Sequence, residues 1–317
     1  MQCKSGLSWV LLVWAKFVTL ALLVLSSPTI SAEPVEQVGK TLVIGKISTN
    51  PKKHFKYLRP ISDYVVERMQ DLGYTDAKVL MAKNVYQLAR YMRQGRVDWV
   101  TETPFASVIL NRKADAEYLL HKWKKGVANY HSVIFARKDS GISSFDDLKG
   151  KVIAFQDRGS STSFYLPAHM LLSDGYELVE MNSYRDSPPK DAIGYIFAKE
   201  EINISTWVHK GIVAAGAYSN LDWYKDDHNP PAFRDIFVQI AHSDEIPRAV
   251  ETVRSDLPDK VKERLKTILL EMETLPAARS VLRSYQVTKK FEPITDEIMD
   301  ELKMIGDVIQ AVDAELE

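Results

Sequence analysis

Cysteine is almost absent from this chain, and its absence limits how the protein can be held together. The only cysteine among 317 residues is Cys3, so no disulfide and no thiolate metal site is available to the rest of the chain. The seven histidines are scattered and form no His-x-x-x-His pair, so we predict no metal site and no cofactor. Because 45% of the residues are hydrophobic, the chain has ample material for an apolar core that stabilises it alone.

Acidic residues are missing from the first 32 positions, where Lys4 and Lys16 are the only charged side chains. An apolar stretch, VLLVWAKFVTLALLVL (10–25), follows the basic start, and small residues follow it up to Ala32. This arrangement is typical of a secretory signal peptide, so we predict cleavage after Ala32 and export of the protein. An uncleaved membrane anchor is the alternative, because the apolar stretch is long, although Lys16 interrupts it.

A strong charge of either sign is also lacking. Removing residues 1–32 takes away two of the 41 basic residues and none of the 42 acidic ones, so the net charge changes from −1 to −3. A chain this close to neutral is not expected to bind nucleic acid. Neither a Gly-x-Ser-x-Gly nucleophile elbow nor a convincing base–nucleophile pair occurs, so we predict no catalytic residues and no enzyme.

What the sequence does contain is an alternation of strand-like and helix-like segments. Strands are predicted at 41–47, 77–82, 97–101, 130–138, 152–155, 177–181, 193–198 and 212–218. Helices are predicted at 60–72, 85–94, 105–113, 166–172, 200–211, 258–273, 276–286 and 295–312, with a short capped turn at 143–151. Such alternation indicates an α/β fold with mostly parallel sheets.

The alternation occurs in two blocks, which predicts two lobes. We assign residues 1–32 to the signal peptide, 40–136 to lobe 1 and 137–246 to lobe 2. Residues 247–317 are expected to return to lobe 1 and to end in C-terminal helices.

Four consecutive hydroxyl residues, Ser160–Ser163, follow the strand predicted at 152–155. In open α/β sheets, ligands bind beyond the carboxyl ends of the strands. The free N–H groups of a helix N-terminus, together with hydroxyls, suit an anion such as phosphate, phosphonate or carboxylate. Serine and threonine are also common helix caps that need no ligand, so that alternative stays open here. Pro167 favours a helix that begins near Ser163.

Four segments carry a resemblance to a known family. The longest is NYHSVIFARKDSGISSFDDLKGKVIAFQDRGSSTSFYLP (129–167), and the shorter ones are GRVDWVTETPFA (95–106), GIVAAGAYSN (211–220) and EIPRAV (245–250). They are similar to segments of the periplasmic substrate-binding proteins of ABC transporters for phosphonate, phosphite and phosphate. The resemblance covers about residues 41–290 and implies a type II periplasmic-binding-protein fold, with a ligand cleft between two lobes and a helical C-terminal segment.

The resemblance also implies a function and a site. We expect a monomer that captures a small phosphorus oxyanion and delivers it to the membrane permease of an ABC transporter. Ser160, Ser161 and Thr162 align with the anion-binding Ser-Thr-Ser residues of the family. The full set of predicted ligand-binding residues is Ser160, Ser161, Thr162, Glu102, Thr103, Tyr130 and Glu201.

Several positions depart from the family pattern. Glu102 stands where members often have an aromatic residue, Glu200 or Glu201 replaces a pocket histidine, and Ala214 replaces an aspartate. A carboxylate repels a neighbouring anion unless a cation intervenes. Either the ligand is zwitterionic, with an amine near Glu102, or these acids point elsewhere and Glu200 and Glu201 favour a helix N-terminus. The alternative function is a sensor that passes a reassigned, zwitterionic or non-phosphorus ligand to a membrane signalling protein.

Overall fold

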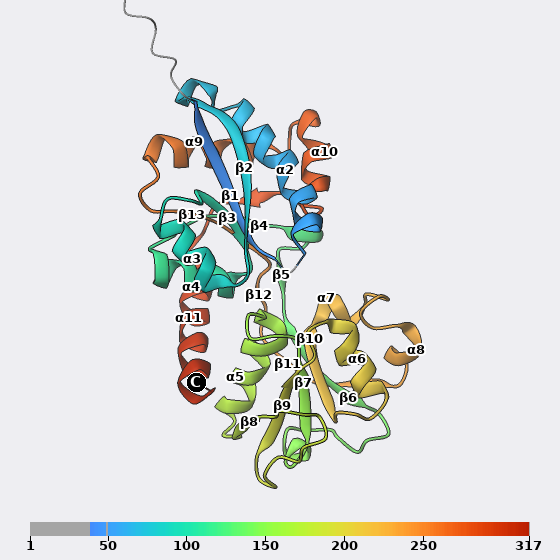
Figure 1. Ribbon diagram of the computed structural model, residues 1–317. Coiled ribbons are helices and arrows are strands. Elements are labelled where there is room, and N and C mark those ends of the chain that lie inside the picture. Colours follow the sequence, from blue (N-terminus) through green and yellow to red (C-terminus); the bar gives the residue numbers. More distant parts are fainter. Residues whose placement is uncertain (1–38, 49, 317) are drawn as a thin grey trace, which may run out of the picture. The chain divides into compact units, whose positions relative to one another are not determined.

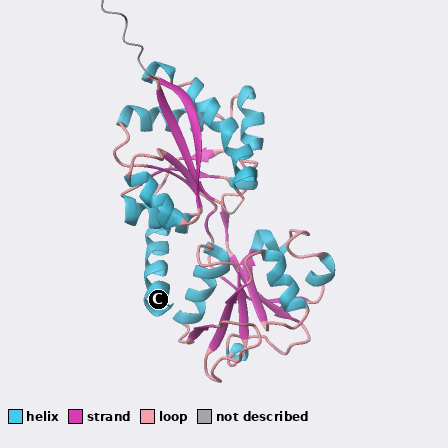
Figure 2. Ribbon diagram, in the orientation of Figure 1, coloured by secondary structure: helices cyan, strands magenta, loops and turns pink. Residues whose placement is uncertain are grey.

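The computed structural model describes residues 39–48 and 50–316, so the predicted signal peptide lies outside the described residues. Within these ranges the chain forms two six-stranded sheets and one two-stranded sheet (Figure 1). Helices lie on both sides of each large sheet (Figure 2). Among the described helices, none has both the length and the apolar character needed to cross a membrane.

The first sheet has the strand order β14-β4-β13-β3-β1-β2. Its strands are β1 (Lys40–Ile47), β2 (Tyr74–Ala82), β3 (Trp99–Glu102), β4 (Glu117–Lys122), β13 (Val250–Val253) and β14 (Phe291–Glu292). Strand β1 pairs in parallel with β2 and β3, whereas β13 pairs antiparallel with β3 and β4. The helices α2 (Pro51–Glu67), α3 (Val85–Arg93), α4 (Pro104–Ala114), α9 (Asp259–Glu271) and α10 (Arg279–Ser284) accompany this sheet.

Helix α3 begins as the sequence predicts, because the Asn84 side chain accepts a hydrogen bond from the backbone N–H of Gln87 at 2.9 Å. The expected start of the preceding helix at Pro60 is wrong. That helix, α2, begins at Pro51, and Pro60 lies inside it. The Asn50 side chain caps the N-terminus by accepting from the Lys53 N–H at 3.1 Å, and a proline at the first helical position costs no hydrogen bond.

The second sheet has the strand order β11-β6-β10-β7-β9-β8. Its strands are β6 (Ser132–Arg137), β7 (Val152–Phe155), β8 (Leu178–Glu180), β9 (Ile193–Phe197), β10 (Ala215–Ser219) and β11 (Phe237–His242). Strands β7 to β10 pair in parallel, and β6 pairs antiparallel with β10 and β11. The helices α5 (Leu166–Ser173), α6 (Glu201–His209), α7 (Asn220–Trp223) and α8 (Pro231–Arg234) accompany this sheet.

Two crossing segments connect the sheets. One contains β5 (Asn129–Tyr130) and the other contains β12 (Ile246–Pro247), and these two short strands pair antiparallel. The predicted single strand at 130–138 is therefore two strands, β5 and β6, that belong to different sheets. A lobe boundary after residue 136 would separate β6 from its own sheet, so the pairings place the first crossing at β5.

The last helix, α11 (Asp296–Leu316), contacts elements of both sheets. It packs against α4 of the first sheet and α5 of the second (Figure 1). Leu302, Ile305 and Ile309 belong to one buried cluster that also includes Phe105 of α4 and Tyr165, which precedes α5. The rings of Phe105 and Tyr165 stack with their centroids 5.1 Å apart. The predicted α/β fold with a helical C-terminal segment is confirmed.

Candidate ligand-binding site

The hydroxyl cluster lies beyond the carboxyl end of β7 and opens a π-helical turn, Ser161–Tyr165, that runs into α5. Ser160 is the cap of this turn, and its hydroxyl accepts a hydrogen bond from the Ser163 N–H at 3.2 Å. The Tyr165 N–H donates to the Ser160 carbonyl at 3.1 Å. The expected helix start near Ser163 is thus wrong, because Ser160 caps a helical turn that begins at Ser161. Pro167 lies in the first turn of α5, where a proline does not interrupt the helix.

Hydrogen bonds to the second sheet fix the position of this turn. The Ser163 hydroxyl donates to the Ala217 carbonyl of β10 and accepts from the Gln156 N–H at 3.0 Å. The Ser132 hydroxyl of β6 donates to the Thr162 carbonyl at 2.6 Å. Both side chains that anchor the turn are buried, so the loop is held rigidly before any ligand arrives.

Ser161 differs from its neighbours. Its hydroxyl oxygen is buried and has no partner with good hydrogen-bond geometry among the described residues, although it lies close enough to Tyr130 to act on the pKa of that residue as a hydrogen-bonding group. A buried polar group without a partner is unfavourable, so such a group in a folded protein requires an explanation. Tyr130 lies close by, and its pKa is raised by burial, against opposite effects of Arg248 and Ser161. An incoming acceptor oxygen would satisfy the Ser161 hydroxyl.

Glu102 is the last residue of β3 and Thr103 follows it, and both side chains are already engaged within the first sheet. The Glu102 carboxylate accepts a hydrogen bond from the Ile47 N–H at 2.7 Å and lies 3.2 Å from the Lys46 ammonium. Lys46 therefore balances the charge that seemed out of place beside an anion. Thr103 caps α4 by accepting from the Ala106 N–H at 3.4 Å. Their contact with a ligand stays a prediction.

Glu201 is the first residue of α6 and belongs to a polar network on the second sheet. The Gln156 side-chain amide donates to Glu201 at 3.0 Å, and His228 Nδ1 lies 2.8 Å from an Asp222 carboxylate oxygen. The Lys225 ammonium lies 2.6 Å from His228 Nε2. The side-chain oxygen and nitrogen atoms by which Glu201, Asp222 and His228 could coordinate a metal ion lie within 4.8 Å of one another. Because each already has a polar partner, the network accounts for them without a metal ion.

Charges interact strongly in this network. Burial raises the pKa of Glu201, and the Asp222 carboxylate raises it further. Burial alone would raise the pKa of Asp222, but hydrogen bonds from His228 and Ser219 hold it below its ordinary value. For His228, burial opposes the charged form, yet the hydrogen bond to Asp222 and the nearby Glu201 raise its pKa.

A group of cations from separate parts of the sequence lies near the crossing segments. They are Lys46 at the end of β1, Lys122 at the end of β4, Lys124 in the turn after β4, and Arg248 after β12. Lys122 is fully buried and lies 3.1 Å from the Glu251 carboxylate. The only local signal was the pair of lysines in WKKG (123–126), just before the longest of the resembling segments begins at residue 129.

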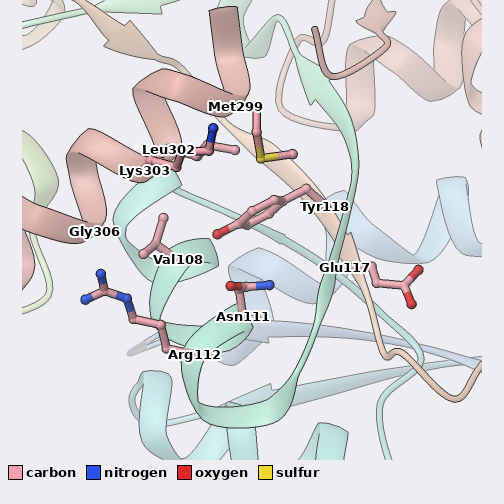
Figure 3. A pocket seen from close by; sticks show the side chains of 9 residues that line it. All are labelled: Val108, Asn111, Arg112, Glu117, Tyr118, Met299, Leu302, Lys303 and Gly306. Atoms are coloured by element: carbon pink, nitrogen blue, oxygen red, sulfur yellow. The ribbon is translucent and has the colours of Figure 1, made fainter. Parts of the chain in front are cut away.

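A cavity lies elsewhere, between α4, β4 and α11 (Figure 3). Its volume is about 570 Å³. It is lined by Val108, Asn111, Arg112, Glu117, Tyr118, Met299, Leu302, Lys303 and Gly306. None of these is a predicted ligand-binding residue. Figure 3 shows the Tyr118 hydroxyl directed into this space, and burial raises the pKa of that hydroxyl to about 12.

Comparisons with known proteins agree with the geometry. A family model described as ABC transporter, phosphonate, periplasmic substrate-binding protein matches residues 47–298. XAC2383 from Xanthomonas citri is 34% identical over 87% of this chain and 99% of that chain. The TM-score is 0.85 for its chloride-bound structure and 0.84 for its ATP-bound structure.

More distant structures share the fold. PhnD1 from Prochlorococcus marinus, solved with methylphosphonate, is 17% identical over 86% of this chain and 99% of that chain, with a TM-score of 0.64. The periplasmic aliphatic sulphonate binding protein SsuA from Escherichia coli is 15% identical over 88% of this chain and 94% of that chain, with a TM-score of 0.53.

The two sheets, the paired crossing segments and the anchored hydroxyl turn define a solute-binding protein of the type II periplasmic fold. The chain belongs to the family of periplasmic phosphonate substrate-binding proteins of ABC transporters. The family resemblance and the fold class predicted from the sequence are confirmed. Members of this family are transport proteins, and the family is not one of enzymes.

Proposed function

We propose that this protein captures a small phosphorus oxyanion after export to the periplasm and delivers it to the permease of an ABC transporter. The observation that carries this proposal is the buried Ser161 hydroxyl, which lies beside Tyr130 and has no well-aligned hydrogen-bond partner in the part of the chain that the structure describes. A phosphonate or phosphate oxygen would accept its hydrogen bond. The methylphosphonate-bound relative and the chloride- and ATP-bound relative are all complexes with anions, which supports an anionic ligand here.

The proposed site has a defined division of roles. Ser161 donates to the ligand, and Thr162 and the N–H groups of the π-helical turn offer further donors. Ser160 holds the turn from its cap position. Glu102, Thr103 and Glu201 border the proposed site. Their side chains already have partners within the protein: Glu102 pairs with Lys46, Thr103 caps α4, and Glu201 accepts from Gln156. No covalent bond of the ligand has to be formed or broken.

Binding selects one arrangement of the two lobes. A ligand shifts a conformational equilibrium only by its difference in affinity for the two states. An anion that contacts Ser161 on the second-sheet side and the cations beside the first sheet would favour the closed arrangement, which a permease can then recognise. We propose that the protein acts as a monomer in this cycle.

A thermal-shift screen with isothermal titration calorimetry tests the proposal. The ligands are phosphate, phosphite, methylphosphonate, a sulfonate and a carboxylate. A ligand at about 100 times its Kd should add about 2.7 kcal/mol to the free energy of unfolding. Ser161→Ala should lower the affinity for a phosphorus oxyanion by about 10- to 100-fold, the usual range for a hydrogen bond to a charged group.

The matched control is Ser173→Ala, because Ser173 is an exposed serine at the end of α5. It should leave affinity unchanged. If no phosphorus oxyanion shifts the melting temperature, the proposed ligand class is wrong. If one binds but Ser161→Ala binds it equally well, the assignment of the hydroxyl turn as the site is wrong.

A further inference from the structure

The cavity between α4, β4 and α11 is large enough to hold a small molecule. Its volume is about 570 Å³, and ligand sites in proteins commonly measure about 300 to 1,000 Å³. None of the residues assigned to the proposed phosphorus oxyanion site lines it. The chemistry of its walls, more than its size, indicates which kind of molecule it fits.

Arg112, near the end of α4, lies directly over the backbone of α11 at Gly306. A Cβ atom at Gly306 would be 2.5 Å from a terminal nitrogen of the Arg112 guanidinium and 3.1 Å from its central carbon. The glycine therefore lets the guanidinium lie against the helix. Because glycine inside a helix is less stable than alanine, α11 gives up some helix stability at the point where it receives Arg112.

The charge of Arg112 is not balanced by the wall of the cavity. Glu117, which lines the same cavity, already accepts hydrogen bonds from the Lys262 ammonium through both carboxylate oxygens, at 2.8 and 2.9 Å. Lys303, on the α11 side, pairs with Asp300 at 2.8 Å. Arg112 has no ion pair and no side-chain hydrogen bond with any residue in the ranges 39–48 and 50–316. It is exposed at the rim and keeps its charge at any physiological pH, so it is available to an anion.

Tyr118 of β4 supplies a hydrogen-bond donor to the same cavity. Figure 3 shows its hydroxyl directed into the space, and no residue of the described chain forms a hydrogen bond with that hydroxyl. Burial raises the pKa of Tyr118 to about 12, although the Arg112 charge acts to lower it. The hydroxyl therefore stays protonated, and it lies near enough to Arg112 for the two groups to interact.

The rest of the wall is largely apolar. Val108 of α4 and Leu302 of α11 are buried, and Met299 of α11 is half-buried. These side chains can cover a hydrocarbon group, which gains free energy by leaving water. An unpaired guanidinium, a free phenol hydroxyl and an apolar surface around one cavity fit an organic anion better than an inorganic one.

We propose that this cavity is a second ligand site and that it binds a small organic carboxylate. The carboxylate contacts Arg112 and Tyr118, and the apolar body of the ligand lies between α4 and α11. A carboxylate matches a guanidinium because two parallel N–H donors reach its two oxygens. This site is separate from the hydroxyl turn and does not depend on the proposed function.

Calorimetric titration of the full-length protein tests this inference. The ligands are phenylacetate, its neutral analogue phenylacetamide, and acetate, which carries the charge without the ring. Phenylacetate should bind at least about tenfold more tightly than phenylacetamide, because the amide has no charge to pair with the guanidinium. It should also bind at least about tenfold more tightly than acetate, which has no apolar body to bury.

Two variants remove the polar contacts. Arg112→Met should weaken the binding of phenylacetate by about 10- to 100-fold, the usual range for a hydrogen-bonded charge. Tyr118→Phe should weaken it by about tenfold, because a hydrogen bond to a charged group is lost. Neither should change the weak binding of phenylacetamide to the same extent.

Gly306→Ala tests the position of Arg112 without removing any polar group. The added Cβ would displace the guanidinium from α11, so the affinity for phenylacetate should fall. The melting temperature should stay the same or rise, because alanine favours the helix. Loss of binding in a variant of undiminished stability cannot be attributed to unfolding.

Two controls locate the binding event. Lys113→Met changes an exposed cation next to Arg112 that does not line the cavity, and it should behave as the wild type. Ser161→Ala should leave the affinity for phenylacetate unchanged, because Ser161 belongs to the hydroxyl turn.

The inference is wrong if phenylacetate does not bind, or if it binds no better than phenylacetamide. It is also wrong if Arg112→Met and Gly306→Ala both leave the affinity unchanged. Loss of phenylacetate binding in Ser161→Ala would place the ligand at the hydroxyl turn and would refute the second site. The titrations with phosphorus oxyanions test the proposed function separately.

Discussion

Replacing Glu251 with glutamine should destabilise the first sheet more than most single substitutions, because Glu251 is a fully buried carboxylate with three partners. It accepts from Trp99 Nε1 at 2.6 Å and from the Tyr285 hydroxyl at 3.0 Å, and it lies 3.1 Å from the Lys122 ammonium. Glutamine keeps an acceptor for the two aromatic donors. The change therefore removes mainly the negative charge that opposes Lys122.

The size of the effect follows from that distance. At 3.1 Å and an effective dielectric constant of about 20, two unit charges attract by about 5 kcal/mol. Removing one partner of a buried pair typically costs about 3 to 5 kcal/mol, since the remaining charge stays desolvated. Lys122 keeps Gln286 and the Thr101 hydroxyl as acceptors. We therefore expect a loss near the lower end, about 3 kcal/mol in the free energy of unfolding.

The loss should depend on pH in a defined direction. Burial lowers the pKa of Lys122 to about 8, against the opposing effect of Glu251. Without Glu251 that pKa falls further, so in the variant Lys122 becomes neutral at a lower pH. The difference in stability between wild type and Glu251→Gln should be largest in mildly acidic solution, where Lys122 is charged, and should shrink as the pH rises towards about 8.

Denaturant unfolding followed by tryptophan fluorescence measures this loss, and the melting temperature should fall by about 6 to 9 °C. The double variant Lys122→Met/Glu251→Gln is the control, because it leaves no unpaired charge and should recover most of the stability. A loss below about 1 kcal/mol, or a double variant no more stable than Glu251→Gln alone, would refute the reasoning.

Three further predictions concern the second sheet. Ser163→Ala should lower the free energy of unfolding by about 0.5 to 1.5 kcal/mol in denaturant titrations, because it removes the hydroxyl that bonds the Ala217 carbonyl and the Gln156 N–H, while the Gln156 N–H keeps the Ser163 carbonyl as an acceptor at 3.2 Å. Gly216→Ala should cost about 1 to 3 kcal/mol in melting experiments, since an added Cβ would lie 2.4 Å from a methyl carbon of Ile204. His228→Gln should destabilise the protein more at about pH 6 than at about pH 8, because the raised pKa of His228 gives stability that is present below about 6.5 and is lost as the pH rises through the folded-state value. Equal losses for His228→Gln at both pH values would contradict this assignment.

The sequence predicted most of the elements whose apolar pattern is continuous. The run VIAF at 152–155 is strand β7 as expected, and Asn84 caps α3 as expected. Strand β4 was missed because EYLLHK contains charged residues at both ends, although its lysine and histidine are buried by tertiary contacts. The crossing segment was missed because the residues from 130 to 138 form one continuous strand-like pattern. Nothing in that pattern indicates that the strands on either side of residue 131 belong to different sheets.

The site was predictable only where its residues are contiguous. Ser160–Ser163 stood out as four neighbouring hydroxyls after a strand, but their different roles depend on Ser132, Ala217 and other residues distant in sequence. The cations at 46, 122, 124 and 248 come from four separate segments. No local pattern indicates that Lys46 and Lys122 have carboxylate partners.

The hydroxyl turn has a consequence for how ligand preference can change over generations. Ser160 holds its cap, Thr162 is tied through its carbonyl and Ser163 is tied through its hydroxyl. Of the four hydroxyls, those of Ser160 and Ser163 hold the turn. Substitution at Ser161 or Thr162 can therefore change the ligand preference at less structural risk than substitution at Ser160 or Ser163. Adaptation to a new solute can begin with a single codon.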